Sequence, residues 1–128
     1  MLDNPQSSAG ITTRHSGVSV GQTIDRLRRL MADRGFTVFN VIDHSGVAER
    51  AGVQMPESKL IMFGKPTVGA AVMVAVPLAA LDIPLKVLVW EDRERSCISQ
   101  LQLTKLPGGA APPGGFPASA IRLGSVDR

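Results

Sequence analysis

Apolar residues recur at helical spacing in one early segment of the chain. They follow one another at intervals of four, three and four residues: Val20, Ile24, Leu27 and Met31. This spacing places them on one face of an α-helix, while charged residues fill the positions between them. The segment is therefore predicted to be an amphipathic helix that packs on a core.

Both ends of this helix are marked in the sequence. Ser19 is followed three residues later by Gln22, which is the pattern of a capping box at a helix N-terminus. Gly35 suits the left-handed conformation that often ends a helix. The helix is expected to begin after Ser19 and to end near Gly35.

Three segments have the β-branched and aromatic residues typical of strands, namely residues 36–42, 59–63 and 85–90. The third is apolar on both faces, which predicts a central strand. Residues 10–15 and 97–104 are weaker strand candidates. Because strands and helices mix without regular alternation, we predict an α+β fold with helices packed on a mainly antiparallel sheet.

Alternation within residues 36–42 predicts which side chains share a face of the sheet. Phe36, Val38, Asn40 and Ile42 are expected on one face, with Thr37, Phe39 and Val41 on the other. After this strand, Asp43 is expected to cap a short helix that runs to Ala51 and is closed by Gly52.

Residues 67–76 are apolar on every side. Such a segment is predicted to be buried, and its alanines together with Met73 favour a helix over a strand. Pro77 is expected to end it.

The domain boundaries follow from composition. Residues 1–9 are polar and without periodicity, which predicts a flexible N-terminus. Residues 10–106 are expected to form one α+β domain. Residues 107–128 begin with four prolines and four glycines in eleven residues, a composition unlike that of a packed core.

The charges of the chain are unevenly distributed. Up to Asp92, nine basic residues balance nine acidic ones, so the net charge of +3 comes from the last 36 residues. A neutral body gives no basic face for nucleic acid, and no apolar stretch is long enough for a membrane span. A single cysteine excludes an internal disulfide and suggests a reducing, cytoplasmic location.

Three blocks of sequence resemble the domain-of-unknown-function 302 family of small bacterial and archaeal proteins. They are Gly35-Phe36-Thr37-Val38-Phe39 with Ile42-Asp43-His44, then Phe63-Gly64-Lys65-Pro66, and then Leu81-Asp82-Ile83-Pro84 continuing to Trp90-Glu91-Asp92. The resemblance implies a domain similar to the TATA-box-binding-protein fold, commonly dimeric and without an established activity. The family usually has asparagine where Lys65 stands.

The chain departs from the family pattern after about residue 95. Family members continue with a Tyr-Asn-x-Pro turn and a Tyr-Leu-x-x-Arg-His helix, but this chain has no tyrosine. One choice of codons for Gln100 to Pro113 encodes Ser-Tyr-Asn-Ser-Pro-Ser-Tyr-Leu-Ala-Ala-Arg-His-His-Leu in the neighbouring frame. We hypothesise that a slip of reading frame between Arg93 and Cys97 replaced the native C-terminus.

Candidate catalytic residues are Asp43, His44 and Glu91. A carboxylate beside an imidazole can transfer protons near neutral pH. The alternative is that Asp43 only caps a helix, that His44 is only exposed, and that Glu91 belongs to a solvated pair with Asp92.

Candidate ligand-binding residues are Phe63, Gly64, Lys65 and Asp92, and the turn at Lys65 could attract a small anion through free amides at the following helix start. The residues after Gly69 do not match a phosphate-binding loop. Cys97 has no evident histidine partner in the sequence, and no spacing of residues indicates a metal or another cofactor.

The sequence thus predicts an uncharacterised ligand-binding or interaction module that acts as a homodimer, without nucleic-acid or membrane partners. The alternative is a small-molecule enzyme with an acid–base site around Asp43, His44, Lys65 and Glu91.

Overall fold

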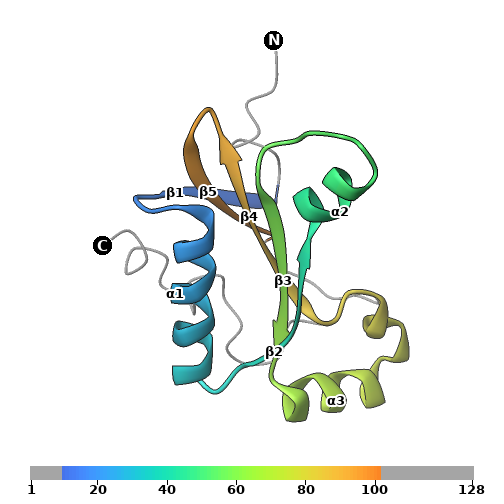
Figure 1. The fold of residues 1–128 in the computed structure, drawn as a ribbon. Helices are drawn as coiled ribbons and strands as arrows, with labels where there is room; N and C mark the ends of the chain where they lie inside the picture. Colours follow the sequence, from blue (N-terminus) through green and yellow to red (C-terminus); the bar gives the residue numbers. More distant parts are fainter. Residues whose placement is uncertain (1–9, 102–128) are drawn as a thin grey trace.

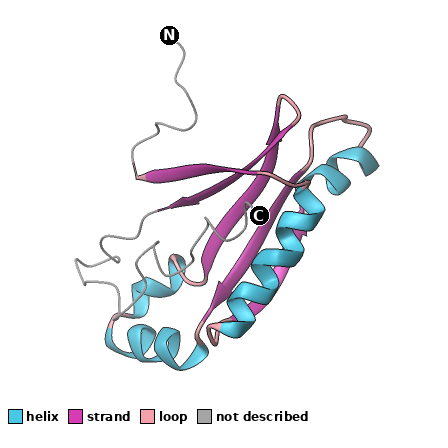
Figure 2. Ribbon diagram, turned by 90° about the vertical axis from the view of Figure 1, so that its left-hand side faces the viewer, coloured by secondary structure: helices cyan, strands magenta, loops and turns pink. Residues whose placement is uncertain are grey.

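A computed structural model describes residues 10–101 of the chain. These residues form a five-stranded sheet with a long helix lying against one of its faces (Figures 1 and 2). In chain order the elements are β1 (Ile11–Ser16), α1 (Val20–Asp33), β2 (Thr37–Asp43), α2 (His44–Arg50), β3 (Ser58–Gly64), α3 (Pro66–Ala75), the 3₁₀ helix η2 (Pro77–Leu81), β4 (Leu85–Asp92) and β5 (Arg95–Leu101).

The strands lie in the order β1-β5-β4-β3-β2, and every neighbouring pair is antiparallel. The predicted α+β class, with helices packed on an antiparallel sheet, is confirmed. The expectation that residues 85–90 form a central strand is also confirmed, because β4 has two strands on each side of it. Of the candidate strand 97–104, the part up to Leu101 is a strand, and the rest lies outside the described residues.

Helix α1 begins and ends where the sequence predicted. The Ser19 hydroxyl accepts a hydrogen bond from the Gln22 backbone N–H at 3.1 Å, and the Gln22 side chain accepts one from the Ser19 N–H at 3.3 Å. Gly35, with φ of +81°, follows the last turn. The capping box therefore satisfies two donors that the helix itself leaves without partners.

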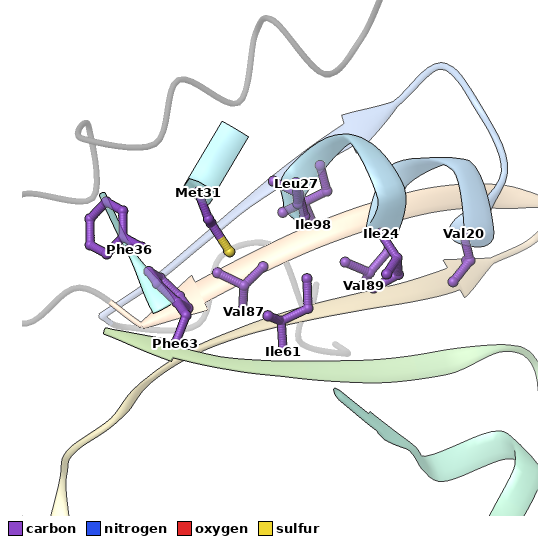
Figure 3. Packing of buried hydrophobic residues seen from close by; sticks show 10 residues of the cluster. All are labelled: Val20, Ile24, Leu27, Met31, Phe36, Ile61, Phe63, Val87, Val89 and Ile98. Carbon is purple, nitrogen blue, oxygen red and sulfur yellow. The ribbon is translucent and has the colours of Figure 1, made fainter. Parts of the chain in front are cut away.

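The core lies between α1 and the sheet (Figure 3). Its buried residues are Val20, Ile24, Leu27, Met31, Phe36, Ile61, Phe63, Val87, Val89 and Ile98. The four residues that the helical spacing predicted are all among them. The rings of Phe36 and Phe63 meet edge to face with centroids 5.3 Å apart, which joins the end of α1 to β3.

The alternation predicted for residues 36–42 is wrong beyond Val38. Val38 pairs with Phe63 and Asn40 pairs with Met62, the neighbour of Phe63, so β2 has a bulge between them. The additional residue, Phe39, changes the face to which the later side chains point. Val38 and Val41, predicted on opposite faces, consequently both pack against the core, while Phe39 is 51% exposed.

The segment 67–76 is a helix and ends before Pro77 as predicted, but the prediction that it is buried is wrong. No residue of α3 is buried. Because β3 and β4 are adjacent and antiparallel, the segment that joins them leaves the sheet and re-enters it at the same end of these strands. Helix α3 and η2 therefore project beyond the end of the sheet and do not cover a face (Figure 1).

Candidate functional site

Asp43 and His44 lie at the junction of β2 and α2. Asp43 is the N-cap of α2, and its Oδ1 accepts hydrogen bonds from the Gly46 N–H at 2.9 Å and from the Ser45 hydroxyl at 2.8 Å. The side chain of His44 is exposed. The hydrogen bond from Gly46, followed by that from Ser45, lowers the pKa of Asp43 below its ordinary value of 3.8. The carboxylate is ionised at neutral pH and holds the start of α2.

A groove opens beside this junction. It has a volume of about 600 Å³ and lies between α2, the segment that follows it, and the start of β3. Its lining residues are Asp43, Ser45, Gly46, Glu49, Val53, Gln54, Met55, Pro56, Glu57 and Lys59. We call it the α2 groove.

The predicted catalytic and ligand residues do not gather in this groove. Only Asp43 lines it. Glu91 lies nearby, because its backbone N–H donates to the Glu57 carbonyl at 2.9 Å. Lys65 follows Gly64 at the other end of β3, whereas Asp43 pairs with Lys59 near the start of that strand. A strand of this length separates its ends by roughly 20 Å.

The predicted ligand residues have structural surroundings of their own. Phe63 is fully buried in the core, and Gly64 is buried beside the ring of Phe39. The Lys65 ammonium lies 5.0 Å from the centroid of the Phe36 ring, a cation–π distance. Asp92 is half-buried at the end of β4. Whether any of these residues binds a ligand stays a prediction.

The structure brings together one pair that the sequence analysis missed. Cys97 of β5 is buried, and its Sγ lies 3.5 Å from Nδ1 of His15 in β1. These residues are 82 positions apart, and only the pairing of the first strand with the last makes them neighbours. Burial raises the pKa of the Cys97 thiol, with a further contribution from Asp92, which favours the protonated thiol at neutral pH.

Beside this pair, a short hydrogen-bonded network crosses three strands. The Trp90 indole N–H donates to the Ser99 hydroxyl at 2.9 Å, and this hydroxyl is 2.8 Å from that of Thr13. Between residues 10 and 101, no group of three or more histidine, cysteine or carboxylate side chains could hold a metal ion. The hydrogen bonds of Trp90, Ser99 and Thr13 thus join β4, β5 and β1.

A second exposed feature lies at the opposite end of β3. Val74 of α3 is 84% exposed, and Leu78 and Leu81 of η2 are 67% and 78% exposed. We call these three side chains the α3–η2 surface. The sequence contains no charged residue from Pro66 to Leu81. This uncharged run is the feature of the sequence from which an exposed apolar surface could have been suspected.

Comparison with known families identifies the fold. The model for the domain of unknown function DUF302 matches residues 11–119, which is most of the chain. The chain belongs to the DUF302 family. A crystal structure of an uncharacterised conserved DUF302 protein from Bacillus stearothermophilus agrees with this fold, with a TM-score of 0.71 at 18% identity over 76% of this chain and 77% of that one.

Part of the chain is also similar to part of some longer proteins. Over 84 residues, or 66% of its length, the chain is 37% identical to proteins named fluoride-specific ion channel FluC 1 from Brucella suis and Brucella abortus. The matching region makes up 33% and 31% of those proteins, so the chain spans about a third of their length. Among the helices described here, none is both long and apolar enough to cross a membrane.

Proposed function

We propose that this DUF302 protein is an interaction module that acts as a homodimer, and that the α3–η2 surface is where the two copies meet. The observation that carries the proposal is the exposure of Val74, Leu78 and Leu81 on α3 and η2. These two elements lie beyond the end of the sheet (Figure 1). Large exposed apolar patches on a folded domain often mark the surfaces by which it contacts other proteins.

The composition of this surface suits contact with an identical copy. In a two-fold interface each residue meets the same patch on the partner, so a charged patch would oppose itself. Residues 66–81 contain no charge, and this repulsion is absent. Burying one valine or leucine side chain contributes about 1.5–3 kcal/mol.

The comparisons support a module in preference to a complete enzyme. A region of this kind forms about a third of the Brucella proteins named as fluoride-specific ion channels, which fits a domain that is joined to other parts. The enzyme alternative has less support. The carboxylate of its acid–base site, Asp43, already accepts hydrogen bonds from Ser45 and Gly46, and Lys65 lies at the far end of β3.

The test is the mass of the protein in solution, measured by light scattering across micromolar concentrations. We expect a dimer for the unchanged chain and a monomer for the double variant Val74→Asp with Leu81→Asp. The matched control is Val47→Asp, because Val47 on α2 is 53% exposed but lies away from the α3–η2 surface. This control is expected to remain a dimer.

Circular dichroism confirms that each variant is folded before its mass is interpreted. An unchanged chain that stays monomeric at every concentration overturns the homodimer. A dimer that persists in the folded double variant overturns the assignment of the interface to α3 and η2.

A further inference from the structure

The α2 groove lies at the other end of the sheet from the α3–η2 surface and has a different chemical character. Three of its lining residues are acidic and one is basic: Asp43, Glu49 and Glu57 against Lys59. The groove is thus negatively charged at neutral pH, although the chain as a whole has a formal charge of +3. A positively charged partner would be attracted to it.

Apolar side chains accompany these carboxylates. Val53 is 56% exposed and Met55 is 42% exposed, and both line the groove. Neither belongs to the hydrophobic core. A partner that matches the groove must therefore present apolar side chains beside its positive charges.

The walls of the groove are fixed by hydrogen bonds within the domain. The Val53 N–H donates to the Ala48 carbonyl at 2.9 Å, which ties the segment after α2 to the helix. The Ser58 N–H donates to the Ser45 hydroxyl at 3.2 Å, and Glu57 is held to β4 through the Glu91 N–H. Because these contacts already exist, a partner has little main chain to order when it binds.

We propose that the α2 groove is a docking site for a basic segment of a partner protein, in which lysine or arginine residues alternate with apolar ones. The positive charges of the segment would face Glu49 and Glu57, and its apolar side chains would contact Val53 and Met55. This site is separate from the proposed dimer surface, and the two proposals can fail independently.

A second copy of this chain is a poorer match for the groove. The outer face of α1 carries exposed arginines, such as Arg28 and Arg29, but the apolar residues of α1 point into the core. The outer face of α1 therefore offers positive charges but no apolar side chains to contact Val53 and Met55. A small inorganic cation would in turn leave Val53 and Met55 without a role.

The test measures the binding of a fluorescein-labelled peptide of alternating lysine and leucine pairs to the full chain by fluorescence anisotropy. A second peptide with glutamate in place of every lysine controls for contacts made by leucine alone. We expect saturable binding of the lysine peptide and none of the glutamate peptide. Failure of the lysine peptide to bind, or equal binding of both peptides, overturns the proposal.

Charge reversal in the groove provides the decisive comparison. The double variant Glu49→Lys with Glu57→Lys is expected to weaken binding of the lysine peptide by about tenfold or more. The matched control reverses two exposed charges elsewhere, Asp25→Lys on α1 with Glu94→Lys in the turn before β5, and is expected to bind like the unchanged chain. Equal weakening by both double variants would show attraction to the whole molecule and would overturn the groove as the site.

The apolar part of the site has its own test. Replacing Met55 with serine is expected to weaken binding several-fold while leaving its dependence on salt unchanged, because no charge is altered. Since the side chain of Met55 is partly exposed and outside the core, the variant is expected to fold normally. An unchanged affinity would remove the apolar half of the proposal.

Discussion

Gln100 in β5 is a polar residue that the fold buries. It is 8% exposed and pairs across the sheet with Val87. Within residues 10–101 its Oε1 has no hydrogen-bond partner. A buried acceptor without a partner is destabilising, since it gives up its hydrogen bond to water and gains none. Gln100 is also the first residue of the segment whose neighbouring frame resembles the family.

The buried oxygen of Gln100 leads to a prediction for the variant Gln100→Met. Methionine has a similar volume and no oxygen to satisfy, so we expect the free energy of unfolding to rise by about 1 kcal/mol. Urea denaturation measures the change. The control is Gln54→Met at an exposed glutamine, where little change is expected. A loss of stability at Gln100 would mean that its amide group contributes more than its buried oxygen costs.

Single residues also show where reasoning from the sequence was insufficient. The sequence located Asp43 as a helix cap because the residue needs only its neighbours Ser45 and Gly46 to act as one. It could not pair Cys97 with His15, because no local pattern connects positions 82 residues apart. Their contact depends on β1 lying beside β5.

At the scale of the element, α2 depends on the ionised form of its cap. The hydrogen bonds to Asp43 lower its pKa below 3.8 in the folded protein. The stability that it contributes is therefore complete above that ordinary value and is lost as the pH falls through the lower, folded value. Acid is expected to weaken the start of α2.

The variant Asp43→Asn tests this expectation, because asparagine also caps helices but does not titrate in this range. Near neutral pH the thermal midpoints of the variant and the unchanged chain should be close. Below pH 3.8 the midpoint of the unchanged chain should fall more steeply than that of the variant. Parallel curves would show that the charge of Asp43 adds nothing to the cap.

Three elements show what periodicity can and cannot predict. The apolar spacing of α1 predicted both the helix and its buried face, because a helix against a sheet buries one stripe. The apolar composition of α3 predicted the helix but not its environment. Likewise, the bulge in β2 left the strand prediction intact and changed only which side chains point to the core.

For the whole molecule, the C-terminal reading-frame hypothesis concerns a segment that begins in β5 and lies outside the described residues after Leu101, and the hypothesis stays a prediction. The family match extends to residue 119, beyond the last residue of β5. Sequencing the gene from codon 92 onward tests the hypothesis. We expect one of the other frames to encode the Tyr-Asn and Arg-His-His segments, and their absence from every frame would refute it. If the frame is restored, the family C-terminus should raise the thermal midpoint of the protein.

The two proposed contact surfaces also belong to this scale. The α3–η2 surface and the α2 groove lie at opposite ends of β3. The surface comes from one run of sequence, residues 66–81, whereas the groove does not. The groove combines residues from β2, α2, the following segment and β3. Such an arrangement allows one copy to pair with another while a separate partner occupies the groove.

The sequence by itself determined the class of fold, most element boundaries and the face of α1 that is buried, because caps and periodicity act between neighbours in the chain. Membership of the DUF302 family rests on the match of the sequence to the family over residues 11–119. Only the tertiary structure decided that α3 lies beyond the sheet, that β2 changes face at Phe39 and that Cys97 meets His15. These features depend on which strands are adjacent. That order is fixed by contacts between distant residues, which no local pattern contains.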